Sequence, residues 1–164
     1  MPTAIPSTPE SSAAPTRLHI RRQGKLRVAR PLARTLELFT PLGEKQWIEG
    51  WDPAIHFPPD GAAQLGTAWT GLDATGHETF WLLVDWEPET PRVRYVRTTP
   101  GIRIGTIEVR CRPLAEGSTE VEVTYELTAL SEAGDADLAT WTEAWYTTFL
   151  AGWESAIQKA FAAE

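Results

Sequence analysis

The sequence contains little cysteine, no basic residue near its start and no long apolar run. Cys111 is the only cysteine among 164 residues, so the chain can form no internal disulfide and no cysteine-based zinc site, which is typical of proteins in reducing compartments. No uncharged apolar run approaches the roughly 18 residues of a membrane helix. No Lys or Arg precedes Arg17, as a signal peptide would require. We therefore expect a cytoplasmic protein without an integral membrane segment.

The charge balance argues against nucleic acid as a partner. The chain has 15 basic and 22 acidic residues, a formal net charge of −7, whereas binding to phosphates requires clustered positive charge. One run differs, because residues 17–34 hold seven basic side chains and no acidic one. Such a run is usually a solvated face, and an anionic partner is the alternative interpretation.

Motifs of common enzyme classes are missing as well. His77-Glu78 begins like a zinc-binding helix, but Trp81 stands where the second histidine is required. The chain contains no phosphate-binding glycine loop, no dinucleotide fingerprint and no Gly-x-Ser-x-Gly elbow. We therefore predict no metal site and no cofactor, and no catalytic residue can be assigned by motif.

The chain divides into a tail and one domain. Residues 1–16 hold four prolines among Ser, Thr and Ala, which predicts a disordered N-terminal tail. Residues 17–164 have the length and apolar content of a single globular domain. Alternation around Leu18-His19-Ile20 predicts a first strand, and two short helices are expected over residues 31–40 and 42–49. Residues 54–66 are expected to be irregular.

The second half of the chain predicts five strands and then a long helix. Turn residues recur at 73–76, 87–91, 100–101 and 116–118 between runs rich in Trp, Val, Ile, Thr and Tyr, a pattern typical of an antiparallel meander. Over residues 135–161 the hydrophobic period changes from 2 to 3.6, which predicts one helix long enough to cross the sheet. The fold class is therefore α+β, with a six-stranded, antiparallel, curved sheet wrapped around a long C-terminal helix.

This element order, a helix-grip order, resembles the SRPBCC superfamily, which includes START domains, polyketide cyclases and proteins similar to the birch-pollen allergen. Local segments are similar to an uncharacterised bacterial branch of that superfamily: Leu38-Phe39-Thr40-Pro41-Leu42-Gly43-Glu44, Trp47 with Gly50-Trp51-Asp52-Pro53, Gly66-Thr67-Ala68-Trp69, Thr98-Thr99-Pro100-Gly101 and residues 123–130. The resemblance covers about residues 17–161. It implies a deep apolar cavity between sheet and helix and does not identify a ligand, because one fold carries many functions.

Candidate cavity residues follow from register and from the aromatic content. The strand that contains Tyr125 alternates clearly, and its register can be extended to the earlier strands by counting residues across the hairpins, assuming no bulges. This count predicts that the following side chains point inward: Cys111, Tyr95, Arg97, Glu78, Phe80, Leu82 and Trp69. A slip of one residue would reverse the faces of the last two strands. The candidate ligand-binding residues are Trp51, His56, Trp69, Phe80, Tyr95, Arg97, Tyr125, Trp141, Trp145 and Phe149. For the last three, their place on the helix face that meets the sheet favours packed core, with cavity lining as the alternative, and in this fold the two can coincide.

Three functions stay open at this point. The first is binding or carriage of a hydrophobic or aromatic small molecule, lipid-like or polyketide-like. The second is a small cyclase, dehydratase or hydrolase in which Tyr95, His56 or Glu78 acts as acid or base. The third is a protein-interaction module with a filled cavity. Strand 80–84 is apolar on both faces, which leaves a homodimer open.

Overall fold

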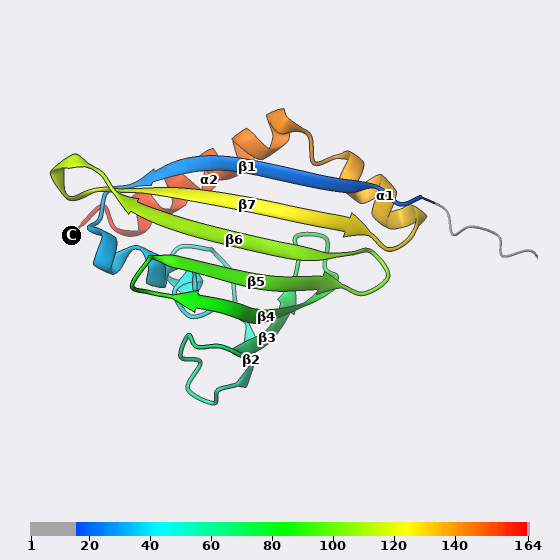
Figure 1. The fold of residues 1–164 in the computed structure, drawn as a ribbon, viewed down its shortest axis with the longest axis horizontal. Coiled ribbons are helices and arrows are strands. Elements are labelled where there is room, and N and C mark those ends of the chain that lie inside the picture. The colour runs from blue at the N-terminus through cyan, green and yellow to red at the C-terminus, as the bar shows by residue number, and fades with distance from the viewer. Residues whose placement is uncertain (1–15, 164) are drawn as a thin grey trace, which may run out of the picture.

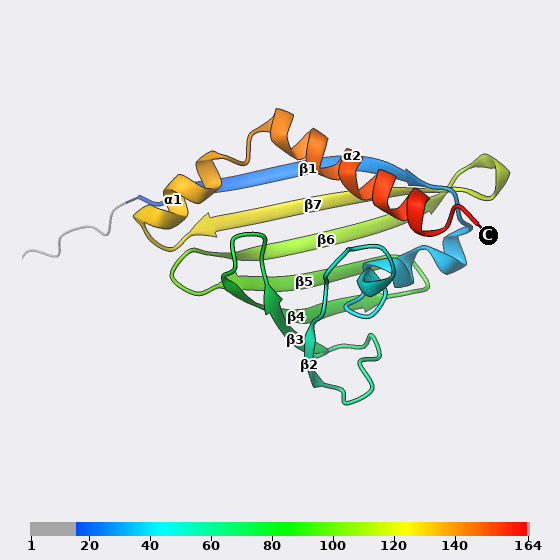
Figure 2. The same cartoon turned by 180° about the vertical axis from the view of Figure 1, so that it is seen from behind.

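The structure is a computed structural model that describes residues 16–163, so nearly all of the predicted tail lies outside the described residues. Its main element is an antiparallel sheet of seven strands in the order β1-β7-β6-β5-β4-β3-β2 (Figure 1). The strands are β1 (His19–Val28), β2 (Ala54–Phe57), β3 (Ala68–Leu72), β4 (Glu78–Glu87), β5 (Arg92–Thr99), β6 (Arg103–Pro113) and β7 (Thr119–Ala129). Helices α1 (Glu132–Ala139) and α2 (Glu143–Ala160) follow. Seen from behind, α2 crosses the inner face of the sheet obliquely (Figure 2).

The predicted meander is confirmed by strands β3 to β7, which pair antiparallel in chain order. Strand β7 has the clearest alternation: its buried side chains include Val121, Val123, Tyr125 and Leu127. Side chains of the opposite parity face outward because successive residues of a strand point to opposite faces. The α+β class and the sheet-over-helix arrangement therefore agree with the expectation.

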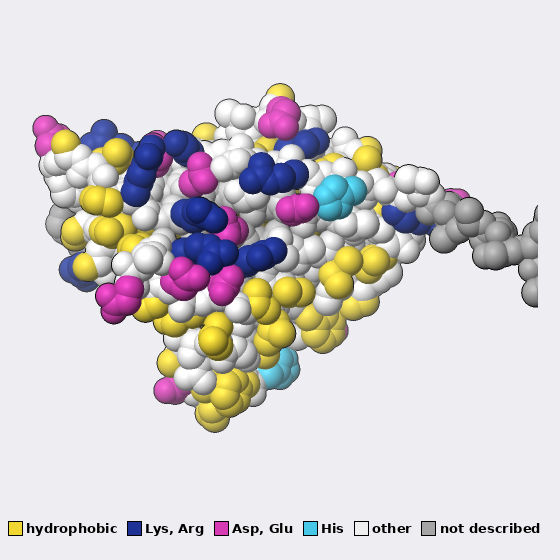
Figure 3. Space-filling view, viewed as in Figure 1, with side chains coloured by type: hydrophobic (Ala, Val, Ile, Leu, Met, Phe, Trp, Pro, Cys, Tyr) yellow, Lys and Arg dark blue, Asp and Glu magenta, His cyan; other side chains and the backbone are white. Residues whose placement is uncertain are grey.

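The outer face of the sheet carries many charged side chains (Figure 3). From the basic run, Arg21, Lys25 and Arg27 of β1 face outward, whereas Arg22 contacts Trp141 on the inner side and Arg30 is buried. Lys25 of β1 forms an ion pair with Glu120 of β7 at 3.0 Å, and Arg17 forms one with Asp135 at 2.7 Å. Positive and negative side chains therefore alternate across neighbouring strands. For the outward-facing residues of the run, this arrangement agrees with a solvated face whose charges are paired, and it differs from a free cationic surface.

Two local predictions are wrong in the first half of the chain. Residues 54–57 form β2, a seventh strand that pairs with β3, where the sequence predicted irregular structure. Because β2 buries little of its surface, it carries no alternating apolar pattern to reveal it. The two expected short helices are three 3-10 turns, Leu32–Arg34, Leu36–Phe39 and Glu44–Gln46.

The single long helix expected over residues 135–161 is also wrong, because the chain breaks between α1 and α2. Thr142 has an extended conformation, and its hydroxyl accepts a hydrogen bond from the backbone N–H of Trp145 at 3.1 Å, which caps the start of α2. The break turns Trp141 inward, where it is 7% exposed. The hydrophobic period continues across the break, so periodicity alone could not locate it.

The face of β4 that points inward is the opposite of the one expected. A bulge at Val84 shifts the β4–β5 pairing, so that Tyr95 pairs with Leu83 and Arg97 pairs with Trp81. The side chains of Phe80 and Leu82, like that of Glu78, consequently face outward and are exposed. One extra residue in β4 therefore reversed the register count beyond the bulge.

Close packing seats α2 against β1 and β7. The hydroxyl of Tyr146 donates a hydrogen bond to the carbonyl oxygen of Val123 at 2.8 Å in the core. A Cβ at Gly24 of β1 would lie 2.6 Å from Cδ1 of Leu150, so a side chain there would require Leu150 to move. With α2 fixed at this edge, the inner faces of β4, β5 and β6 remain to line a cavity.

Candidate functional site

Two adjoining cavities lie on the inner face of the sheet. The first, called the inner chamber here, has a volume of about 120 Å³, and the second, the outer chamber, has about 370 Å³. They share five lining residues and are therefore contiguous: Ile48, Trp51, Trp81, Arg97 and Trp153. The inner chamber is completed by Phe39, Glu44, Trp69, Tyr95, Ile107, Val109 and Tyr125. The outer chamber is completed by Leu72, Asp73, Ala74, Thr75, Arg103, Asp137, Thr140, Trp141, Trp145 and Phe149.

Aromatic rings form most of the walls. The ring of Trp81 lies parallel to that of Trp69, with centroids 6.0 Å apart, and perpendicular to that of Trp51 at 5.3 Å. In the outer chamber the rings of Trp145 and Phe149 are stacked at 5.0 Å. Flat, rigid walls of this kind suit apolar or aromatic ligands.

Arg97 is the charged group at the junction of the two chambers. It is only 8% exposed, and its Nε atom has no hydrogen-bond partner. Among residues 16–163, no carboxylate oxygen lies within the 4.0 Å of an ion pair with its guanidinium. The guanidinium carbon instead lies 5.7 Å from the ring centroid of Trp81 and 6.0 Å from that of Tyr125. Burial lowers the pKa of Arg97.

Glu44 begins the third 3-10 turn, which follows a loop of residues 40–43, and brings a carboxyl group into the inner chamber. The loop is tied by Thr40, whose hydroxyl donates to the carbonyl oxygen of Glu37 at 2.7 Å and accepts from the N–H of Gly43 at 3.0 Å. Gly43 is required there, because a Cβ would lie 1.8 Å from the Glu37 carbonyl oxygen. Burial raises the pKa of Glu44 to about 8, against the opposing charge of Arg97. This carboxyl group is therefore mostly protonated near neutral pH.

Two tyrosines complete the polar part of the inner chamber. The hydroxyl of Tyr95 donates a hydrogen bond to the carbonyl oxygen of Phe39, which ties β5 to the 3-10 turns. Burial raises the pKa of Tyr95 well above 10, and it raises the pKa of Tyr125 to about 12 against the charge of Arg97. Both phenols stay neutral at ordinary pH, so the chamber presents one cation among neutral groups.

An ion-pair network closes one end of the outer chamber. Arg103 of β6 is 4% exposed and forms ion pairs with Asp73 of the β3–β4 turn at 2.8 Å and with Asp137 of α1 at 2.6 Å. Burial acts to raise the pKa of Asp73, but hydrogen bonds from Thr75 and His77 and the charge of Arg103 outweigh it and lower that pKa to about 2. The network therefore holds the turn, the sheet and α1 together.

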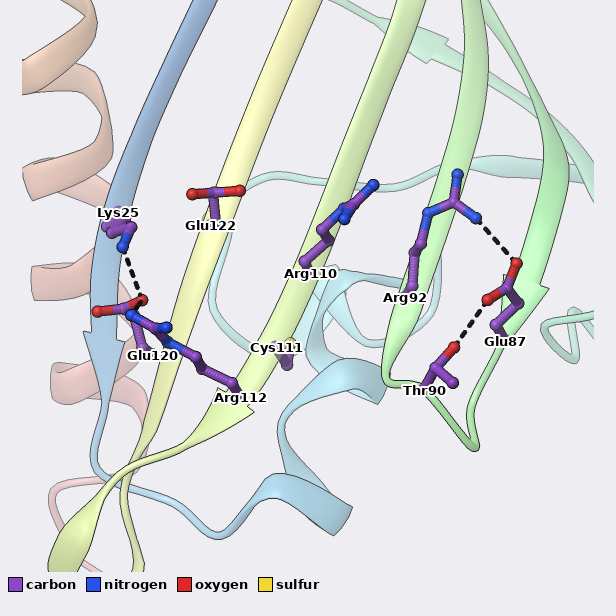
Figure 4. Close-up of a pocket in the computed structure, with 9 residues that line it drawn as sticks. All are labelled: Lys25, Glu87, Thr90, Arg92, Arg110, Cys111, Arg112, Glu120 and Glu122. Atoms are coloured by element: carbon purple, nitrogen blue, oxygen red, sulfur yellow. Dashed lines mark hydrogen bonds and ion pairs between the residues drawn. The ribbon is translucent and has the colours of Figure 1, made fainter.

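A more voluminous hollow, about 560 Å³, lies on the outer face of the sheet and is a weaker candidate (Figure 4). Its cations are already paired: Arg92 with Glu87 at 2.8 Å and Arg112 with Glu120 at 2.6 Å. Its lining is mostly charged and lacks the aromatic walls of the inner-face chambers. Cys111 also lines it, and burial raises the pKa of this thiol to about 12.

The structure brings together most of the residues that the sequence singled out. Trp51, Trp69, Tyr95, Arg97 and Tyr125 line the inner chamber, and Trp141, Trp145 and Phe149 line the outer chamber. Their role in ligand binding stays a prediction.

His56 and Phe80 do not belong to either chamber. His56 lies on β2, where its Nε2 atom is 3.0 Å from the hydroxyl of Thr70, and Phe80 is 41% exposed on the outer face. The loop containing His56 pairs with β3 as an edge strand, and the bulge at Val84 turns Phe80 outward. The sequence predicted His56 at the cavity because its loop was expected to border the entrance. It predicted Phe80 there because the register count assumed no bulge.

Sequence reasoning missed Glu44, Trp81, Trp153 and Arg103. Glu44 follows Thr-Pro-Leu-Gly, a turn sequence that places it after a helix stop but does not show where its side chain points. Trp81 was assigned to the wrong face by the unseen bulge. Trp153 follows Phe149 by four residues, so it shares a helix face with a residue that was considered.

Residues 16–163 offer no group of three or more His, Cys, Asp or Glu side chains placed to hold a metal ion. None of the helices described is long and apolar enough to cross a membrane.

The fold and the chambers define the class of the protein: an antiparallel sheet that encloses an aromatic cavity against a C-terminal helix. Comparisons with protein-family models and with curated protein sequences gave no match. Solved structures do match the fold. Norcoclaurine synthase from Thalictrum flavum aligns with a TM-score of 0.66 at 15% identity, over 99% of this chain and 100% of that one.

Two bacterial structures are also similar. An uncharacterized protein from Rhizobium leguminosarum aligns with a TM-score of 0.63 at 17% identity, over 88% of this chain and 97% of that chain. CalU16 from Micromonospora echinospora aligns with a TM-score of 0.55 at 16% identity, over 86% and 84%. These likenesses, all at 17% identity or less, establish a shared fold.

Proposed function

We propose that the protein binds a hydrophobic or aromatic small molecule, lipid-like or polyketide-like, in the two chambers between the sheet and α2. The observation that carries the proposal is the contiguous cavity of about 120 and 370 Å³, walled by Trp, Tyr and Phe rings. Small-molecule sites are concave and mostly apolar, with a few polar groups that orient the ligand. Arg97 and Glu44 are such groups.

The structural neighbours support this proposal by analogy. Norcoclaurine synthase from Thalictrum flavum has been solved with dopamine and hydroxybenzaldehyde, two small aromatic molecules. That protein shares 16% identity with this chain in the alignment, so the analogy rests on the fold. The volumes and aromatic walls of the chambers are compatible with ligands about as large as dopamine and hydroxybenzaldehyde.

Catalysis on such a ligand is the second candidate, favoured by Glu44. A carboxyl group with a pKa of about 8 exchanges its proton near neutral pH, as a general acid or base must. His56 and Glu78, considered from the sequence for this role, lie outside both chambers, so Glu44 replaces them in the hypothesis. A cyclase, dehydratase or hydrolase reaction would use this group beside Arg97.

Binding can be tested with a matched pair of variants on exposed threonines. Thr140 lines the outer chamber, whereas Thr147 does not, and each hydroxyl donates to a backbone carbonyl of its own helical segment, at 2.7 and 3.0 Å. Thr140→Phe places a ring at the outer chamber, and Thr147→Phe places the same ring away from it. Native mass spectrometry of protein from its own host, followed by titration of tryptophan fluorescence with the extracted molecule, measures binding.

We expect the wild type and Thr147→Phe to bind equally and Thr140→Phe to bind at least about tenfold more weakly, a loss of about 1.4 kcal/mol. Equal binding by all three proteins would place the ligand elsewhere. If no molecule from the host extract or from a panel of lipids and aromatic metabolites binds the wild type, the proposal is wrong, and the alternative of a protein-interaction module gains support.

The cytoplasmic location, the homodimer and the lack of a role with nucleic acid stay predictions from the sequence. The exposed side chains of Phe80, Leu82 and Val84 on the outer face of β4 keep the homodimer open.

A further inference from the structure

The arginines of this chain differ in how their charge is balanced. Arg103, 4% exposed, has two carboxylate partners, and Arg92, whose side chain is 21% exposed, has three. Arg97 is also buried, at 8% exposed, and has no carboxylate partner among the described residues. A buried charge without a counter-charge is strongly unfavourable, so folded proteins pair such groups or use them to bind a ligand.

No group of the inner chamber supplies the missing negative charge. The Glu44 carboxyl group lies beyond ion-pair distance of Arg97 and is mostly protonated near neutral pH. The phenols of Tyr95 and Tyr125 are neutral. The carboxylates of Asp73 and Asp137 at the outer chamber are held by Arg103.

We propose that the ligand is a hydrophobic carboxylate whose carboxylate group binds Arg97, while its apolar body occupies the outer chamber. This inference rests on the proposed function and names the chemical class of its ligand. Arg97 lines both chambers, so its guanidinium is reached from either one. A planar guanidinium binds a carboxylate through parallel hydrogen bonds, and the free Nε–H is one of its donors.

The rest of the site fits the same ligand. The outer chamber offers the rings of Trp141, Trp145 and Phe149 to an apolar or aromatic body. Protonated Glu44 offers an O–H donor in the inner chamber, which a carboxylate oxygen accepts and an ester oxygen accepts less well. Both polar groups therefore favour an acid over its neutral derivatives.

The experiment compares 2-naphthylacetate with its methyl ester as probes. Isothermal titration calorimetry at neutral pH measures both affinities for the wild type, Arg97→Met and Arg97→Lys. Arg94→Met is the matched control, because Arg94 lies on the outer face of the same strand and lines neither chamber. Circular dichroism and the midpoint of thermal unfolding verify that each variant folds.

We expect the wild type and Arg94→Met to bind the acid about ten- to hundredfold more tightly than the ester, because only the acid forms a charge-assisted hydrogen bond between its carboxylate and Arg97. Arg97→Met should lose this preference while retaining affinity for the ester, and Arg97→Lys should keep part of it. Arg97→Met should also unfold at a temperature no lower than the wild type when no ligand is present, since it removes an unpaired buried charge.

Equal wild-type affinities for acid and ester, or an unchanged preference in Arg97→Met, would overturn the carboxylate proposal and leave hydrophobic binding intact. Binding of neither probe to the wild type counts against both proposals. If Arg97→Met does not fold, the wild-type preference and the partial preference of Arg97→Lys still decide the question.

Discussion

Replacing Asp73 with asparagine should destabilise the protein by about 2 kcal/mol at neutral pH. The shift of its pKa from 3.8 to about 2 corresponds to about 2 kcal/mol of stabilisation of the folded state by the ionised carboxylate. The Asp73 side chain is 6% exposed, so solvent screens the interaction with Arg103 little. Asparagine keeps a carbonyl oxygen able to accept from the N–H groups of Thr75 and His77, but as a neutral acceptor. The loss therefore combines the weakening of these hydrogen bonds with the loss of the ion pair to Arg103.

The direction of the pKa shift determines how the stabilisation by Asp73 depends on pH. Because the folded-state pKa of Asp73 is depressed, its contribution is fully present above pH 3.8 and disappears as the pH falls through about 2. Urea unfolding followed by tryptophan fluorescence at several pH values measures the difference between the wild type and Asp73→Asn. The difference should be constant from about pH 5 to 8 and shrink towards pH 2.

A matched substitution on the surface serves as the control. Asp52 forms an ion pair with Lys45 at 3.0 Å, but its side chain is 87% exposed. Asp52→Asn should therefore change the free energy of unfolding by less than about 0.5 kcal/mol. An equally small effect of Asp73→Asn at neutral pH, or an effect that persists below pH 2, would refute the assignment of a stabilising buried network around Arg103.

Three further predictions concern the site and the core. The stability of the wild type should fall by roughly 5 kcal/mol as the pH rises from 4.5 through about 8, because Glu44 must lose its proton while it is buried in the folded state. Glu44→Gln should flatten this part of a urea-unfolding series. Gly43→Ala should destabilise by about 3 kcal/mol in the same assay, because its Cβ meets backbone atoms; a normal midpoint would show that the loop adapts. Tyr146→Phe should cost about 1 kcal/mol by removing the buried hydrogen bond from the Tyr146 hydroxyl to the carbonyl oxygen of Val123, and calorimetry showing no change would contradict that role.

Local signals in the sequence determined most of the fold. The turn residues at 73–76, 87–91, 100–101 and 116–118 mark the four hairpins because glycine, proline and polar residues suit tight turns, and each separates two observed strands. The alternation in β7 determined its buried face, since side chains of a strand point to opposite sides. The apolar period after residue 135 determined that helix would cover the sheet, because an amphipathic stripe must be buried.

Only the tertiary structure decided the site. The bulge at Val84 decides whether Phe80 or Trp81 faces the cavity, and the residues of β4 are apolar on both faces, so no local pattern reveals it. The position of Glu44 near Arg97 joins two segments more than 50 residues apart through the packing of the 3-10 turns on the sheet. Burial and pKa are properties of that packing, because they depend on which groups from distant segments exclude water from one another.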